Sequence, residues 1–166
     1  MFKRFFQKIQ DYIKFHLVYR VESKKHQEFL IQAIKKSAIF SKLTRKQCKS
    51  LLKLSQEVGI KRGEVLFYKC DISDNMYIVL EGQMVATMET SASSKKIGSI
   101  NMGETVGELG ALSQKPRSLT ISALCDCKLL KISRMAIFKF WKLYASAEFH
   151  VQMLNQIIER SQSIIK

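Results

Sequence analysis

The chain is organised around the stretch VGELGALSQKPRSLT, residues 106–120. It begins with a glycine and a carboxylate, Gly107 and Glu108, and it closes on Arg117. Gly107 can adopt backbone angles that are closed to other residues, and a helical turn that starts there would point free N–H groups at a phosphate. The planar guanidinium of Arg117 can hold two phosphate oxygens at once, and Ser118 adds a backbone N–H and a hydroxyl group. The stretch therefore predicts an anion-binding site.

Glu108 needs a separate explanation, because a carboxylate repels a bound phosphate. Acidic residues accept hydrogen bonds from ribose hydroxyls in dinucleotide-binding sites. A ribose site beside a phosphate site predicts a nucleotide ligand. The alternative is that Arg117 and Glu108 form an internal ion pair on a surface turn, a type of pair that contributes little stability.

The same residues resemble the phosphate-binding cassette of the cyclic nucleotide-binding domain family. That cassette is a Gly-Glu pair, an apolar turn and an arginine that is often preceded by proline, and the chain matches it at Gly107, Glu108, Leu109, Pro116 and Arg117. The resemblance implies that Glu108 binds the ribose 2′-hydroxyl and that Arg117 binds the cyclic phosphate. It also implies that the backbone amides of Gly107 and Ser118 bind the remaining phosphate oxygens. The predicted ligand-binding residues are thus Gly107, Glu108, Leu109, Arg117 and Ser118.

The resemblance also implies the ligand and the fold. The ligand is cyclic AMP or cyclic GMP, and a hydroxyl residue at Ser118 often accompanies guanine binding in the family. The fold is α+β, an antiparallel β-roll flanked by N-terminal and C-terminal helices. Two positions depart from the family pattern. A small residue is usual where Leu119 stands, so its side chain is expected to narrow the pocket, and glycine is usual where Cys70 stands, so the backbone there is expected to be altered.

Charge is unevenly distributed along the 166 residues, whose formal net charge is +14. Residues 1–50 hold 13 Lys and Arg against 3 Asp and Glu, a net charge of +10, while residues 51–166 hold 15 against 11, a net charge of +4. A basic surplus suits nucleic acid, anionic lipid or an acidic protein. Since no base-reading motif follows the domain, no nucleic-acid partner is expected. The apolar runs are too short to span a membrane.

Residues 1–36 are predicted to form a basic amphipathic helical arm, and residues 37–166 the cyclic nucleotide-binding-like domain with its C-terminal helices. Within residues 1–20, apolar side chains recur at steps of three and four, with basic residues largely elsewhere. We favour packing of this arm on its own domain or on a partner protein. An anionic membrane surface is an alternative, and a mitochondrial address is a third, weakened by Asp11 and by the absence of serine.

The predicted elements of the domain follow turn and cap signals. Thr44 can cap a helix that runs to about Ser55. Strands are expected at residues 58–61, 65–68, 76–80, 83–88 and 96–101, with more within 118–132 and turns at Gly63, Asp71 and Gly82. Helices follow Ser133. In the family the final helix folds over the nucleotide base, which makes three residues on one helical face candidates for a lid: Phe149, Met153 and Ile157.

The chemistry-bearing residues do not predict a metal or a catalytic centre. The cysteines and histidines are too scattered to form a zinc ligand set, and Cys125 and Cys127 are expected to alternate on a strand. The four cysteines are therefore interpreted as packing thiols: Cys48, Cys70, Cys125 and Cys127. No nucleophile, base and acid are arranged for hydrolysis, and no GxxxxGK[ST] loop occurs. Without a secretory signal, an intracellular location is expected.

The sequence therefore predicts a non-catalytic regulatory subunit that binds a cyclic nucleotide and signals through a partner protein. The alternative is a structural or adaptor subunit of a larger assembly that keeps the fold with weak or no nucleotide binding. Retained Glu108 and Arg117 favour the first, while Leu119 and Cys70 favour the second.

Overall fold

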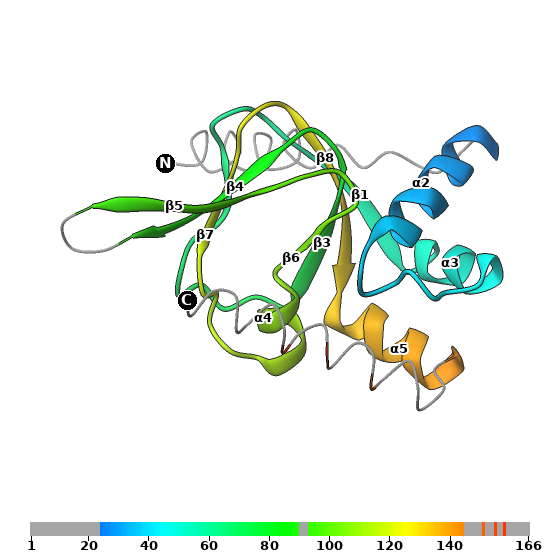
Figure 1. Cartoon of the computed structure of the whole chain (residues 1–166). Coiled ribbons are helices and arrows are strands. Elements are labelled where there is room, and N and C mark those ends of the chain that lie inside the picture. The colour runs from blue at the N-terminus through cyan, green and yellow to red at the C-terminus, as the bar shows by residue number, and fades with distance from the viewer. Residues whose placement is uncertain (1–23, 90–92, 145–150, 152–154, 156–157, 159–166) are drawn as a thin grey trace, which may run out of the picture.

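The computed structural model describes residues 24–89, 93–144, 151, 155 and 158. Within these residues, eight strands form two antiparallel sheets of four strands each, which confirms the predicted β-roll (Figure 1). In sheet order, the first sheet is β1 (Ser55–Ile60), β8 (Cys127–Ser133), β3 (Asn75–Glu81) and β6 (Thr105–Val106). The second is β2 (Val65–Phe67), β7 (Thr120–Ala123), β4 (Met84–Glu89) and β5 (Ser94–Ile100).

Helices lie beside the first sheet. Three of them gather on its outer side, namely α2 (Lys24–Lys36), α3 (Arg45–Leu52) and α5 (Arg134–Tyr144), as Figure 1 shows. The short helix α4 (Glu108–Ser113) follows β6 directly. The fold is therefore α+β, as predicted, with helices packed on one face of a two-sheet roll.

Strand β3 joins the two hydrophobic cores of the domain. Successive side chains of a strand point to opposite faces of the sheet. Met76, Ile78 and Leu80 lie in the core shared with the helices, whereas Tyr77 and Val79 lie in the core between the two sheets. The first sheet is thus buried on both faces, which is why β3 reads as a nearly continuous apolar run.

Helix α2 is packed into the domain. Leu30, Ile31 and Ile34 are buried in the core shared with α3 and the first sheet. His26 Nε2 also lies 2.7 Å from Oε1 of Glu57, a buried residue of β1. The predicted division of the chain at residue 36 stays a prediction. Residues 24–36 nevertheless pack on the roll, and the predicted helix at residues 1–20 lies outside the described residues.

Helix α3 begins with the predicted cap. The Thr44 hydroxyl accepts a hydrogen bond from the Gln47 amide at 3.3 Å, and Gln47 Oε1 accepts one from the Thr44 amide at 2.8 Å. This reciprocal pair is a capping box. The predicted extension to Ser55 is wrong, because Ser55 already pairs with Ile132 as the first residue of β1. Strand pairing has replaced the last helical turn.

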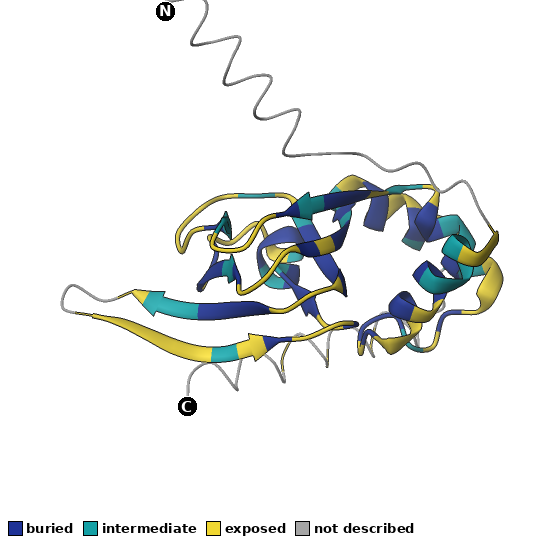
Figure 2. Cartoon of the chain, turned by 90° about the horizontal axis from the view of Figure 1, so that it is seen from above, coloured by how far each residue is buried: buried dark blue, intermediate teal, exposed yellow. Residues whose placement is uncertain are grey.

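The turns of the roll include the predicted glycines. Gly63 and Gly82 have positive φ angles of 83° and 90°. Figure 2 shows the hairpin of β4 and β5 projecting from the roll, with β5 mostly exposed. The strands expected within residues 118–132 are β7 and β8. The expectation that Cys125 and Cys127 alternate on one strand is wrong, because Cys125 lies in the turn before β8.

Two features are absent from the described residues. None of the helices there is long and apolar enough to cross a bilayer. In the same part of the chain, no group of three or more His, Cys, Asp or Glu residues is arranged to hold a metal ion.

Candidate functional site

The stretch that dominates the sequence folds as a turn and a short helix. Gly107 has a φ angle of 78° and precedes α4 as its N-terminal cap residue. Its carbonyl accepts a hydrogen bond from the Ala111 amide at 3.0 Å, which closes the first turn. Gln114, with a φ angle of 58°, ends the helix. The helical turn predicted at Gly107 is therefore confirmed. The first amides of a helix have no hydrogen-bond partner within the helix itself.

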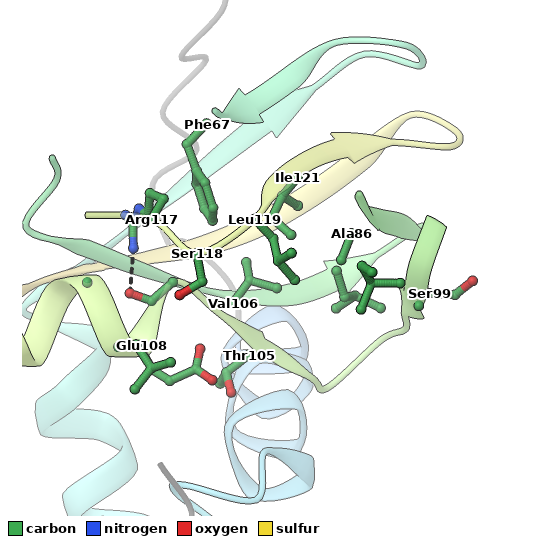
Figure 3. A pocket seen from close by; sticks show the side chains of 16 residues that line it. Phe67, Ala86, Ser99, Thr105, Val106, Glu108, Arg117, Ser118, Leu119 and Ile121 are labelled. Carbon is green, nitrogen blue, oxygen red and sulfur yellow. Dashed lines mark hydrogen bonds between the residues drawn. The ribbon is translucent and has the colours of Figure 1, made fainter. Parts of the chain in front are cut away.

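A cavity of about 410 Å³ opens beside this turn (Figure 3). It brings together all five residues that were predicted to bind the ligand, and these are Gly107, Glu108, Leu109, Arg117 and Ser118. The cavity also receives residues from β2, β4, β5, β6 and β7, so both sheets contribute to it. The roles assigned to the five residues stay predictions, whereas their convergence is a property of the structure.

The side chain of Arg117 is fixed by the main chain. Its Nη1 donates to the Gly107 carbonyl and its Nη2 to the Asn75 carbonyl, both at 2.5 Å. Only 3% of the residue is exposed, and its buried Nε has no hydrogen-bond partner. The guanidinium carbon also lies 4.1 Å from the centre of the Phe67 ring. The alternative was an internal ion pair between Arg117 and Glu108. In the structure, the terminal nitrogens of Arg117 instead donate hydrogen bonds to two carbonyl oxygens.

The burial of Arg117 has an electrostatic consequence. Burial lowers the pKa of the Arg117 guanidinium from its ordinary value, and the charges of Tyr77, Glu108, Asp71 and Asp74 oppose this change. The guanidinium remains a cation at neutral pH because an arginine loses its proton only in strong base. A buried cation is costly unless an anion or several acceptors compensate it. The site therefore favours an anionic ligand.

The backbone of Arg117 is tied to the turn that contains Cys70. The Cys70 amide donates to the Arg117 carbonyl, and the Arg117 amide donates to the Asp71 carbonyl, both at 2.9 Å. Cys70 has a φ angle of 71°, in the left-handed region that favours glycine. The expected alteration of the backbone at Cys70 is therefore wrong. The turn keeps a glycine-like conformation, and these two hydrogen bonds hold it against Arg117.

Glu108 and Ser118 line the cavity together with Arg117. Glu108 is the first residue of α4 and is only 5% exposed. Figure 3 shows its carboxylate beside Thr105 and shows the Ser118 hydroxyl pointing into the cavity. One wall of the cavity thus presents a cation, a carboxylate and two hydroxyl groups.

The rest of the cavity lining is mostly apolar. Leu119 is 8% exposed and lines the cavity, as does Ile97 of the exposed strand β5. The other apolar side chains of the lining are Ala86, Ile100, Val106 and Ile121, together with Phe67 beside Arg117. Sequence reasoning missed Phe67, Thr105 and the contribution of β5. Alternation along a strand places such residues inside or outside the roll, but only the pairing of the strands brings them to one cavity.

The proposed lid residues Phe149, Met153 and Ile157 lie outside the described residues. Their contact with the cavity stays a prediction.

Comparison with known proteins gives a family match. A family model described as "Cyclic nucleotide-binding domain" matches residues 57–144, which is more than half of the chain. The cAMP-dependent protein kinase regulatory subunit of Dictyostelium discoideum is 27% identical over 115 residues, which are 67% of this chain and 34% of that protein. The lysophospholipase nte1 of Aspergillus terreus is 33% identical over 78 residues, which are 46% of this chain and 5% of that protein. The chain thus spans about a third or less of the length of these relatives.

Solved structures share the fold. The regulatory domain of Toxoplasma gondii PKA with cAMP superposes with a TM-score of 0.68 and 22% identity, over 72% of this chain and 46% of that chain. A cyclic nucleotide-binding domain from Methylobacillus flagellatus superposes with a TM-score of 0.72 and 18% identity, over 90% of this chain and 84% of that chain. At these identities the likeness establishes the β-roll with its flanking helices.

Proposed function

We propose that the pocket of this chain, which belongs to the cyclic nucleotide-binding domain family, binds cyclic AMP or cyclic GMP. We also propose that a partner protein receives the signal. The observation that carries the proposal is the buried guanidinium of Arg117 on the wall of the cavity. A cyclic phosphate bears one negative charge and would compensate this cation. The apolar part of the cavity lining would shield the pair from water, which strengthens a charge-assisted hydrogen bond.

Arg117 has donors left for a phosphate. A guanidinium carries five N–H groups, of which two are engaged by the carbonyls of Gly107 and Asn75. Each terminal nitrogen therefore keeps a second hydrogen that it can donate to a phosphate oxygen without breaking the bond to the main chain. The two carbonyls thus orient the guanidinium before the ligand arrives, and the amides at the start of α4 would complete the phosphate site.

The remaining parts of a cyclic nucleotide fit the other two surfaces. Glu108 would accept a hydrogen bond from the ribose 2′-hydroxyl, and the apolar wall that contains Leu119 would bury one face of the base. The apolar residues supply little to distinguish adenine from guanine, and the hydroxyl of Ser118 is the proposed group that does. We therefore propose that both nucleotides bind.

The proposed activity is regulatory and not catalytic. A ligand shifts a conformational equilibrium by its difference in affinity for the two states, and a partner protein would respond to that shift. We propose that residues 1–36 hold the partner, with an anionic membrane surface as the alternative, and that the protein acts inside the cell. The whole length of a regulatory subunit exceeds this chain, so these assignments rest on the pocket and on the charge of the arm.

A second candidate is an adaptor that keeps the fold and binds nucleotide weakly or not at all. One observation favours it. Leu119 occupies part of the cavity wall where the family usually has a small residue. A bulky side chain there would reduce affinity without disturbing the roll.

Thermal unfolding of the whole chain with added nucleotide tests the proposal. Cyclic AMP or cyclic GMP should raise the midpoint of unfolding in a saturable manner, since a ligand at a hundred times its Kd adds about 2.7 kcal/mol to the free energy of unfolding. Linear 5′-AMP, which has an additional negative charge and no cyclic phosphate, is the matched control and should raise it far less. No rise with either cyclic nucleotide would favour the adaptor.

A further inference from the structure

Two cysteines meet at the end of the roll, away from the cavity lining. Cys127 begins β8 and is 4% exposed, whereas Cys125 is exposed in the turn before it. Both sulfurs contact Gln83 in the turn between β3 and β4. The Gln83 amide donates to Cys125 Sγ at 3.2 Å, and the Cys127 thiol donates to the Gln83 carbonyl at 3.4 Å. The two side chains therefore converge on one residue.

Further contacts confine the buried sulfur. The Cys127 thiol also reaches the Cys125 carbonyl at 3.2 Å. A Cβ atom added to Gly82 would lie 2.6 Å from Cys127 Sγ, so the glycine leaves room for the sulfur and nothing larger. Cys127 can therefore move little, and Cys125, two residues earlier, is the cysteine that shares its contact with Gln83.

The two thiols differ in their readiness to react. A thiol attacks a disulfide as the thiolate, and attack requires access to the reagent. Burial raises the pKa of Cys127, and the neighbouring Cys125 raises it further. Cys125 has the access that Cys127 lacks. The exposed thiol is thus suited to react first and the buried one to react second.

We propose that Cys125 and Cys127 form a dithiol site that a low-molecular-weight disulfide oxidises to an intramolecular disulfide. The Cys125 thiolate attacks one sulfur of the small disulfide, which forms a mixed disulfide and releases one small thiolate. Cys127 then loses its proton to solvent and attacks the Cys125 sulfur, and the second small thiolate leaves. The protein loses two hydrogen atoms in total, and the small disulfide is reduced to two thiols.

Mass spectrometry of the whole folded chain tests the site. The chain is incubated with glutathione disulfide, denatured, alkylated and cut with trypsin, which releases residues 118–128 as one peptide that contains both cysteines. We expect this peptide to lose both alkylation sites and to become lighter by two hydrogen masses. A peptide that stays doubly alkylated, or that accumulates a stable glutathione adduct, would overturn the proposal.

Two variants separate the two steps of the reaction. Cys127→Ser should trap glutathione on Cys125 as a stable adduct, because the second thiol is missing. Cys70 is also an exposed thiol, but it lies outside the peptide 118–128. Cys70→Ser should therefore leave oxidation of that peptide unchanged. Phenylarsine oxide, which bridges two nearby thiols, gives an independent reading on the unaltered chain. It should protect Cys125 and Cys127 together from alkylation, and alkylation at the rate seen without it would contradict their proximity.

Discussion

The guanidinium carbon of Arg117 lies 4.1 Å from the centre of the Phe67 ring, while the terminal nitrogens of the same group donate to the carbonyls of Gly107 and Asn75. The cation is therefore held between an aromatic face and the main chain. An arginine fixed in this way loses little side-chain entropy when an anion binds. Phe67 and Arg117 act as one structural unit of the proposed phosphate site.

Replacing Phe67 with leucine should weaken cyclic nucleotide binding. The substitution removes a cation–π contact, worth about 1 kcal/mol, and should therefore lower affinity roughly fivefold. Calorimetric titration with cyclic AMP measures the change. Phe138→Leu is the matched control, because Phe138 packs under Arg134 at 5.2 Å on the protein surface outside the cavity lining. An equal loss in both variants would remove Phe67 from the site.

Leu119 is expected to limit the affinity of the pocket. Leu119→Ala should increase affinity for both cyclic nucleotides because it widens the cavity, while the free energy of unfolding falls by about 2–4 kcal/mol. Titration and denaturant unfolding measure the two effects separately. Leu129→Ala is the control, since Leu129 is fully buried in the same core and does not line the cavity. It should lose stability with no gain in affinity. If Leu119→Ala binds no better than the natural chain, Leu119 is not an obstruction.

Ser118 is expected to give a small preference for cyclic GMP. Its hydroxyl can add one hydrogen bond to the guanine 2-amino group, worth about 0.5–1.5 kcal/mol, which is roughly a tenfold preference at most. Competition titrations should show that the preference disappears in Ser118→Ala. Ser99→Ala, which changes another serine of the cavity lining, is the control. A large preference for cyclic AMP, or one that survives the substitution of Ser118, would exclude this role.

The family and the architecture could be predicted from the sequence because both depend on local signals. Gly107, Gly63 and Gly82 mark turns that need positive φ angles, and the structure has them. The signal at Thr44 also placed the start of α3 correctly. The end of that helix could not be predicted, because Ser55 belongs to a strand that pairs with Ile132, a residue far along the chain. Strand β6 was missed because two residues carry no periodicity.

The sequence predicted the side chains of the site but not the backbone groups that hold them. Arg117, Glu108 and Ser118 were found from their types and spacing. The acceptors that orient Arg117 are carbonyls of Gly107 and Asn75, and every residue has a carbonyl, so no sequence pattern marks them. The contacts of Cys125 and Cys127 with the main chain of Gln83 could not be predicted either, because they too involve backbone groups. Contacts of this kind depend on how distant turns meet.

The basic arm is expected to act separately from the pocket. Deleting residues 1–20 should leave cyclic nucleotide affinity unchanged, because the cavity is lined by residues of the roll and α4. The deletion should abolish retention of a partner protein from cell extract. Phosphatidylserine vesicles test the membrane alternative by co-sedimentation. If the shortened chain retains partner and vesicles as well as the full chain does, the arm is not the docking segment.

Removal of Arg117 addresses the central claim, and it should also lower the stability of the fold. Two carbonyls and the Phe67 ring would now lose their partner, so we expect the free energy of unfolding to fall by about 1–3 kcal/mol. Arg117→Lys keeps the positive charge and loses the planar fork, and it should bind with intermediate affinity.

The most direct measurement is therefore calorimetric titration of the whole chain and of Arg117→Ala with cyclic AMP and cyclic GMP, below the unfolding temperature of both proteins. Arg134→Ala, which removes an arginine outside the cavity lining, serves as the control. We expect the natural chain and the control to bind with one site per chain. We expect Arg117→Ala to lose about 1.5–3 kcal/mol of binding free energy, roughly ten- to a hundredfold in affinity. Equal affinity of Arg117→Ala and the natural chain would contradict it.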